Sequence, residues 1–359
     1  MARTVEPSKP IAIGLVGAGM IGRFRADAVD RTPGLRLAAV ADPVPEALAK
    51  LTRERPGVTA YGDGRALVAA PDLDAVIISA PPGLHEPLGV ACLRAGKHLL
   101  CEKPLATSVA ACESLVRAAD ESGASLATGF NLRYLEAAQL ARRLVDDGAI
   151  GELDHVRAFH GYSAADGIPN NWMRDPAMSG GGSLMDNGIH VIDMCRWFLG
   201  DVRDVVGYSS NHMLDIPGCE DNGFVLMRNA DGRVATLHST WAEWRGYGYR
   251  VEVYGTHGYV RFGYPPMHLM HGRRMAGGKV STRRYLFPTY QLKERIRGWQ
   301  WGLHLTLFRE MTAWADALRA GVPPPITGRD GLEAVRIAQA AQPVCTERGR
   351  MLPRRRDDG

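Results

Sequence analysis

The chain has 359 residues, enough for two domains of ordinary size, and its 45% hydrophobic content indicates a globular protein with a sizeable core. The formal net charge of +4 is too small to indicate a nucleic-acid partner, and no apolar run is long enough to cross a bilayer. The polar start without an apolar signal core, and the six scattered cysteines without zinc-like spacing, favour a cytoplasmic protein that needs no metal.

The first part of the chain alternates short apolar runs with stretches of helical periodicity. The expected strands are Ile11–Val16, Leu35–Ala41, Ala75–Ser79, His98–Cys101 and Ser125–Thr128. The expected helices are Ile21–Val29, Glu46–Arg53, Glu86–Ala95 and Leu135–Asp147. Strands that alternate with helices in this way predict a parallel sheet covered on both faces.

The pattern changes near Gly148–Gly151, where strands begin to follow one another with few helices between them. The expected strands are Leu153–Gly161, Val202–Ser210, Gly223–Arg228, Val234–Trp241, Arg250–Tyr254 and Tyr259–Phe262. Helical stretches at Leu303–Ala320 and Leu332–Ala341 follow and could pack back on the first domain. We therefore expect an α/β protein with a parallel-sheet domain at 10–130 and flexible tails at 1–9 and 353–359. Residues 131–345 should form an α+β domain with an open, mainly antiparallel sheet.

A glycine-rich turn follows the first expected strand. The segment Gly17–Gly22 (GAGMIG) fits G-x-G-x-x-G and opens a helix at Met20 and Ile21. In such a turn Gly17 permits the tight bend, Gly19 lets the backbone approach a pyrophosphate, and Gly22 lets helix and strand pack closely. An ordinary strand-to-helix turn can also carry glycines, but the strand–turn–helix context favours a dinucleotide site, with phosphates at the helix N-terminus.

The cofactor preference depends on Asp42, which follows the second expected strand. A carboxylate there would accept hydrogen bonds from both hydroxyls of an adenine ribose and would repel a 2′-phosphate. The next residue is Pro43, which cannot bind such a phosphate. The sequence therefore favours NAD over NADP, and an additional role of Asp42 as a helix N-cap is compatible with this.

Lys103 is a first candidate for catalysis, because Glu102-Lys103-Pro104 follows the HLLC strand. The carboxyl ends of parallel strands are where ligands bind. Desolvation at such a place could lower the proton affinity of a lysine and suit it to acid–base chemistry. On its own, a Glu–Lys pair is more often a solvated salt bridge.

The second candidate is the stretch Gly180–Asp193 (GGGSLMDNGIHVID). Helical continuation would place Asp186 and His190 one turn apart on one face, where a carboxylate fixes the imidazole tautomer and raises its basicity. A surface helix pair is the alternative, but the preceding glycines favour a site because they let a ligand approach the backbone. We predict His190 as general base, Asp186 as its orienting partner and Lys103 as hydrogen-bond donor, with Lys103 as the alternative base.

Together these motifs resemble the Gfo/Idh/MocA oxidoreductases, the glucose-fructose oxidoreductase and inositol dehydrogenase group. The resemblance extends from about Ile11 to Ala341 and depends on the glycine turn, Ala80-Pro81 with His85, Glu102-Lys103-Pro104 and the Gly180–Asp193 stretch. It implies a Rossmann domain followed by a domain whose open sheet packs against another subunit, in a homodimer or homotetramer. The basic stretch Arg273–Arg297 would lie at that contact or form a mobile surface loop.

The resemblance also implies roles for single residues. Lys103, Asp186 and His190 would face the nicotinamide, and the peptide bond before Pro104 would be cis. Besides Gly17, Gly19, Met20, Ile21, Gly22 and Asp42, the implied cofactor contacts are Ser79, Ala80, Pro81, His85, Glu102, Lys103, Asn131 and Trp172. The candidate substrate contacts are Lys103, Arg133, Trp172, Asp186, Asn187, His190 and Glu243. Among these, Arg133 lies where inositol dehydrogenase-like members place a substrate-binding arginine, and Trp172 with Arg174 resembles a loop that reaches cofactor or substrate.

The predicted function is NAD-dependent oxidation of a secondary hydroxyl on a sugar, cyclitol or aminoglycoside-like substrate. Two segments depart from the family pattern and leave the substrate open: the aromatic Trp241–Tyr249, and Tyr264–Arg297, which is rich in His and Arg. Acidic residues of the second domain could favour an amino sugar or could be surface charges; they are Asp166, Asp175, Glu220, Asp221 and Glu243.

Three other functions stay open at this point. An NAD-dependent glycosidase, which oxidises its substrate transiently, would use the same Lys/Asp/His set. An imine or pyrrole-type reductase would have less use for an Asp–His dyad than an alcohol dehydrogenase. A non-catalytic NAD-binding regulatory protein would be expected to lose Lys103 or His190, and this chain keeps both.

Overall fold

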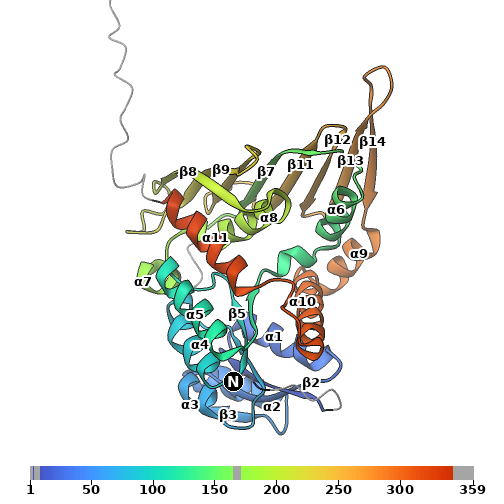
Figure 1. The fold of residues 1–359 in the computed structure, drawn as a ribbon. Coiled ribbons are helices and arrows are strands. Elements are labelled where there is room, and N and C mark those ends of the chain that lie inside the picture. Colours follow the sequence, from blue (N-terminus) through green and yellow to red (C-terminus); the bar gives the residue numbers. More distant parts are fainter. Residues whose placement is uncertain (1–2, 4–8, 165–170, 343–359) are drawn as a thin grey trace, which may run out of the picture.

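The chain folds around two β-sheets, one in each half of the sequence (Figure 1). The computed structural model describes residue 3, residues 9–164 and residues 171–342. The tails expected at 1–9 and 353–359 lie outside these residues, apart from Arg3 and Lys9. The expected fold class is confirmed, with a parallel sheet first and a mainly antiparallel sheet second.

The first sheet is parallel, with strand order β3-β2-β1-β4-β5-β6. Its strands are β1 (Ile11–Val16), β2 (Leu35–Ala41), β3 (Thr59–Tyr61), β4 (Ala75–Ile78), β5 (His98–Glu102) and β6 (Leu126–Gly129). Every residue of β1 and β4 is buried, because helices cover both faces of the sheet. Strands β2 and β3 are added on one side of β1, and strands β5 and β6 are added on the opposite side, beyond β4. The strand order therefore reverses between β1 and β4. Open α/β sheets bind ligands at such a switch point, at the carboxyl ends of the strands.

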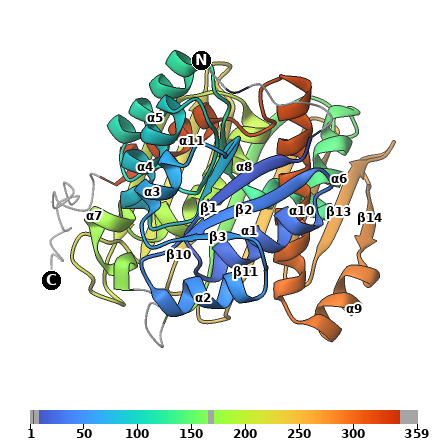
Figure 2. The same ribbon diagram turned by 90° about the horizontal axis from the view of Figure 1, so that it is seen from below.

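Helices pack on both faces of this sheet. They are α1 (Met20–Arg31), α2 (Pro45–Arg53), α3 (Gly64–Ala69), α4 (His85–Arg94) and α5 (Val109–Ser122). Figure 2 shows α3, α4 and α5 on one side of the strands and α1 and α2 on the other. Helix α10 (Gln300–Ala320), from the far end of the chain, lies beside α1, and its Leu307, Met311 and Trp314 complete the apolar core on that side.

The second sheet has eight strands in the order β14-β13-β12-β11-β7-β10-β9-β8. Its strands are β7 (Leu153–Gly161), β8 (Val202–Ser210), β9 (Asn222–Asn229), β10 (Val234–Thr240), β11 (Gly248–Gly255), β12 (Gly258–Tyr264), β13 (His268–Arg274) and β14 (Val280–Leu286). Strands β7 and β10 pair in parallel, and the other neighbours pair antiparallel.

Within the described residues, helices cover one face of the second sheet and leave the other open. Helices α6 (Glu136–Asp146), α8 (Ile189–Leu199) and α11 (Gly328–Ala341) lie between this sheet and the Rossmann domain in Figure 1. In β9 buried and exposed residues alternate, as expected when one face of a sheet meets a core and the other meets solvent. The remaining helices are the short α7 (Pro176–Ser179) and α9 (Pro288–Arg297). In the described part of the chain no helix has the length and apolar character needed to cross a bilayer.

The basic stretch Arg273–Arg297 is ordered secondary structure, so its interpretation as a mobile loop was wrong. It forms the end of β13, the edge strand β14 and helix α9, with Arg274 opposite Val280 in the ladder. Strand β14 has one partly buried residue and is otherwise exposed. It therefore lacks the apolar alternation by which a strand is predicted, and charged side chains on an edge strand also discourage pairing with other chains.

A buried ion-pair network links the segment just after β6 to two later helices beneath the second sheet. Arg133, just after β6, donates to Asp193 of α8 through Nε at 2.8 Å and through Nη2 at 2.6 Å, and it lies 3.4 Å from Asp330 of α11. Burial raises the pKa of Asp193, although the charge of Arg133 opposes this effect. Nε and Nη2 of Arg133 are engaged by these carboxylates, which gives the residue a structural role that any contact with substrate would accompany.

We expect Arg133→Met to lower the free energy of unfolding by about 3 kcal/mol, because it leaves Asp193 buried without its partner. Urea denaturation measures this. The matched control is Arg329→Met, which removes an exposed pair with Asp120 and should cost about 0.5 kcal/mol or less. Unchanged stability of Arg133→Met together with a raised KM would restore the substrate-binding interpretation.

Candidate active site

The glycine turn closes tightly on β4 and leaves space in front of α1. A Cβ on Gly17 would lie 2.6 Å from the Ser79 carbonyl oxygen, and one on Gly22 would lie 1.8 Å from that of Gly17. A Cβ on Gly19, in contrast, would meet no atom within 4 Å. No side chain caps α1, so the N–H groups of its first turn are free to bind a pyrophosphate. These features fit a dinucleotide cofactor.

The loop after β4 supports the same fit. The hydroxyl oxygen of Ser79 is buried without a hydrogen-bond partner among the described residues, as expected in a site that a ligand completes. The ring nitrogens of His85 lie 2.8 Å from the Ala80 carbonyl oxygen and 2.9 Å from that of Pro104. His85 thus ties the β4 loop to the β5 loop, where the peptide bond before Pro104 is cis, as expected.

Asp42 follows β2 at the same edge of the sheet and anchors the glycine turn. Its carboxylate accepts hydrogen bonds from the N–H of Ala18 at 2.6 Å and of Val44 at 2.8 Å. The side chain is only partly buried. Since a carboxylate can accept about four hydrogen bonds, capacity for a ribose remains.

Two of the expected cofactor contacts have partners inside the protein. Glu102 accepts from Nε of Arg25 in α1 at 2.6 Å, and Arg25 also pairs with Glu310 of α10. Asn131 donates its amide to the hydroxyl of Thr306, also in α10, at 2.8 Å. These side chains hold α10 against the Rossmann domain, and any contact with the cofactor would be additional to that role.

Lys103 and Asp186 meet at the carboxyl edge of β5. The Lys103 Nζ lies 2.8 Å from the carbonyl oxygen of Asp186 and 3.0 Å from its Oδ1. The Oδ2 atom accepts from the hydroxyl of Tyr162 at 2.9 Å and from Nε1 of Trp241 at 3.0 Å. Among the described residues no hydrogen bond joins Asp186 to His190, so the pair expected from the spacing is not formed; Lys103, Tyr162 and Trp241 contact the Asp186 oxygens instead. The backbone at Leu184–Gly188 is also a π-helical turn, not the regular α-helix assumed.

His190 lies beside Lys103, on the first turn of α8, and is buried. Burial and then the positive charge of Lys103 lower the pKa of His190 well below its usual value. Its Nδ1 has no hydrogen-bond partner among the described residues. A neutral imidazole in this position can accept a proton.

His160 of β7 lies next to His190, with ring centroids 5.9 Å apart. Its Nδ1 lies 2.8 Å from the Asn187 carbonyl oxygen, and its Nε2 lies 3.0 Å from the hydroxyl oxygen of Tyr247. Because a carbonyl only accepts, Nδ1 carries the proton and Nε2 accepts from Tyr247. Burial lowers the pKa of His160 to about 4, so this ring is also neutral.

Other predicted substrate contacts have partners within the protein. The amide of Asn187 donates to the carbonyl oxygens of His160 at 2.7 Å and Thr240 at 3.2 Å, so it has no free donor to offer a ligand. Glu243 accepts from the N–H of Arg245 in its own loop. Trp172 is partly buried against the small apolar cluster that contains Trp241, and Arg174 is exposed.

The acidic residues that could have favoured an amino sugar are mostly engaged by backbone. Glu220 accepts from Gly182 and Leu184, Asp221 accepts from His212, Met213 and Leu214, and Asp175 caps α7. Asp166 lies outside the described residues. The structure therefore offers little support for the aminoglycoside interpretation.

Tyr162, Trp241, His160 and Tyr247 were not predicted as site residues. The aromatic character of Trp241–Tyr249 was a visible signal, whereas nothing in the sequence singled out His160 or Tyr162. Their positions depend on the parallel pairing of β7 with β10, two strands far apart in the chain.

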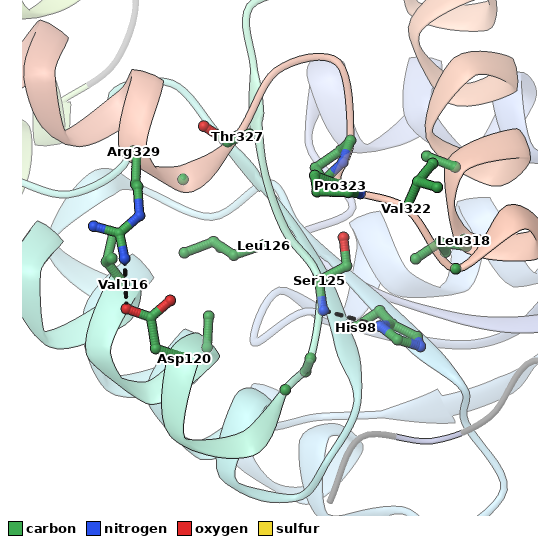
Figure 3. Close-up of a pocket in the computed structure, with 17 residues that line it drawn as sticks. His98, Val116, Asp120, Ser125, Leu126, Leu318, Val322, Pro323, Thr327 and Arg329 are labelled. Carbon is green, nitrogen blue, oxygen red and sulfur yellow. Dashed lines mark hydrogen bonds and ion pairs between the residues drawn. The ribbon is translucent and has the colours of Figure 1, made fainter.

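A cavity of about 600 Å³ lies at the opposite, amino edge of the Rossmann sheet (Figure 3). It is bordered by His98, the first residue of β5, and by Ser125, which precedes β6. The ion pair between Asp120 and Arg329 also borders it. None of its lining residues belongs to the groups around Lys103 and Asp186, so this cavity is not the catalytic site.

Comparison with known proteins agrees with this geometry. Residues 11–130 match the oxidoreductase family with NAD-binding Rossmann fold, and residues 138–261 match the GFO/IDH/MocA C-terminal domain. Inositol 2-dehydrogenase of Rubrobacter xylanophilus is 30% identical over 340 residues, which cover 93% of this chain and 90% of that protein. Levoglucosan dehydrogenase of Pseudarthrobacter phenanthrenivorans is 28% identical over 285 residues, covering 70% and 73%.

Among solved structures, levoglucosan dehydrogenase in complex with NADH matches with a TM-score of 0.82 and 26% identity, covering 92% of this chain and 95% of that one. The relatives named above are dehydrogenases, and both halves of the chain match the corresponding family domains. The chain belongs to the Gfo/Idh/MocA family of NAD-binding oxidoreductases.

Proposed function

We propose that this protein oxidises a secondary hydroxyl of a sugar or cyclitol to a ketone, with NAD as the cofactor. The observation that carries the proposal is the Lys103–Asp186 ion pair beside the neutral His190, at the carboxyl edge that also bears the glycine turn. The names of the relatives, inositol 2-dehydrogenase and levoglucosan dehydrogenase, support this substrate class.

The chemistry divides between the two basic side chains. Of the three N–H groups of a lysine ammonium, Lys103 directs donors to two oxygens of Asp186, which leaves capacity to bind the substrate oxygen. His190 accepts the hydroxyl proton, and the charge of Lys103 stabilises the oxygen as that proton leaves. When bound, NAD supplies the acceptor for the hydride. Asp186 thus orients Lys103 and does not orient His190, the proton acceptor.

The test is a panel of cyclitols, anhydrosugars, amino sugars and an aryl glycoside with NAD, followed by nicotinamide absorbance. On the best substrate, Lys103→Ala and His190→Ala should each lower kcat by about a hundredfold or more, the scale of acid–base catalysis. NAD affinity, measured by calorimetry, should change far less, because the glycine turn and Asp42 are intact. The exposed Lys50→Ala serves as the control. Near-normal turnover in both site variants would refute the assignment, and aglycone release from the aryl glycoside would favour a glycosidase.

We also propose that Asp42 selects NAD over NADP. The wild-type protein should use NAD more efficiently, and Asp42→Ala should narrow the ratio of the two kcat/KM values, because the charge that repels a 2′-phosphate is lost. Asp74→Ala is the matched control, since Asp74, like Asp42, accepts a backbone N–H (that of Ala12 in β1) but lies at the opposite edge of the sheet. Equal efficiency with both cofactors in the wild-type protein would contradict this assignment.

The third proposal concerns assembly through the uncovered face of the second sheet. Val206 and Tyr208 of β8 lie opposite Leu226 and Phe224 of β9, and all four are at least 46% exposed. A contiguous apolar patch of this kind is typical of a protein contact, and a second copy of the chain would cover it. Light scattering should show a dimer or tetramer at micromolar concentration, and Tyr208→Glu should dissociate it.

A second variant, Arg284→Glu on the exposed edge strand β14, distinguishes assembly through the β8–β9 face from assembly through the basic stretch Arg273–Arg297. If the uncovered face is the contact, this variant remains associated. A monomeric wild-type protein would overturn the proposal.

A further inference from the structure

Two aromatic side chains hold the Asp186 carboxylate, and the proposed chemistry uses neither of them directly. The hydroxyl of Tyr162 and the indole N–H of Trp241 both donate to Oδ2, while Lys103 contacts Oδ1. Each oxygen of the carboxylate thus has its own partners, which come from different elements of the fold. The carboxylate is fixed from both sides.

Backbone hydrogen bonds link the two segments that carry these donors. Tyr162 and Trp241 come directly after the ends of β7 and β10, the strands that pair in parallel. The N–H of Tyr162 donates to the Thr240 carbonyl at 3.1 Å, and that of Ala164 donates to the Trp241 carbonyl at 2.8 Å. The Trp241 side chain is 1% exposed and packs in an apolar cluster with Met173 and others.

Burial and the neighbouring charge have opposite effects on the pKa of Asp186. Burial by itself would raise the pKa of Asp186, but the charge of Lys103 and the hydrogen bonds from Trp241, Lys103 and Tyr162 lower it below the usual value. Burial and the Asp186 charge raise the pKa of Tyr162, so its hydroxyl remains a donor. Five titratable side chains lie around Asp186, and they come from four parts of the fold. Lys103 follows β5, His160 lies in β7 and Tyr162 follows it. Tyr247 precedes β11, and His190 lies in α8.

We propose that Tyr162 and Trp241 are positioning residues: they keep Asp186 a carboxylate aimed at Lys103, so that Lys103 presents its remaining donor to the substrate oxygen. The hydrogen bonds favour the charged form of a buried acid, which would otherwise take up a proton and release the lysine. The role of Lys103 toward substrate rests on the proposed function. The hold on Asp186 does not, and it can be measured without substrate.

The kinetic test uses Tyr162→Phe and Trp241→Phe, which remove one donor each and keep an aromatic ring. Both variants should move the acid limb of the kcat/KM profile to higher pH by about one pH unit, because Asp186 becomes easier to protonate. They should also lower kcat about tenfold with little change in KM. Tyr249→Phe is the matched control, because the Tyr249 hydroxyl is buried without a partner among the described residues, and its profile should match the wild type.

The substrate-free test follows the indole N–H resonance of Trp241 by NMR, assigned through its loss in Trp241→Phe. Its chemical shift reports protonation of Asp186, and the midpoint in Tyr162→Phe should lie about one pH unit above that of the wild type. Midpoints and acid limbs that coincide with the wild type would overturn the positioning role. A raised midpoint in a protein that oxidises no polyol would support the hold on Asp186 and defeat the proposed function instead.

Discussion

A carboxylate withdrawn from most of its water needs partners, and the catalytic edge is arranged around this requirement at Asp186, whose side chain is 23% exposed. Lys103 reaches it from the parallel sheet, while Tyr162 and Trp241 reach it from the second sheet. The cost of taking such a charge out of water is several kcal/mol unless partners replace the lost hydration. Satisfying Asp186 therefore requires that the two domains keep one relative position, and that position brings His190 next to Lys103.

The same rule applies at two other places where the halves of the chain meet. Arg25 of α1, which is fully buried, lies between Glu102 of β5 and Glu310 of α10. Arg133 pairs with Asp193 of α8 and approaches Asp330 of α11. Each network ties an early segment of the chain to a helix that comes much later. Because a buried ion pair is costly to break, these networks specify how the late helices dock.

The surroundings of His190 and Lys103 give these two basic groups opposite tasks. Lys103 is paired with a carboxylate and donates, whereas burial and the charge of Lys103 keep His190 neutral, with a ring nitrogen that can accept a proton. Neighbouring titratable groups in different environments commonly serve as separate acid and base in enzymes.

Much of the fold could be predicted from the sequence, because local patterns reflect local burial. The predicted bounds of β1, β2, β7 and β8 agree with the structure. The glycine turn, Asp42 at a strand end and the cis bond before Pro104 were likewise expected and are found in place. The strands, the glycine turn and Asp42 are each encoded in a short stretch of sequence, so they can be recognised without the folded chain, whereas the cis bond was implied by the family resemblance.

Tertiary structure alone decided which side chains meet. Asp186 pairs with Lys103, and Arg133 pairs with Asp193, although spacing and resemblance predicted other partners. Tyr162 and Trp241 become neighbours because β7 and β10 pair in parallel, and the charged edge strand β14 forms because β13 offers it a partner. Strand order and register come from packing between distant segments, and a local pattern carries no record of either.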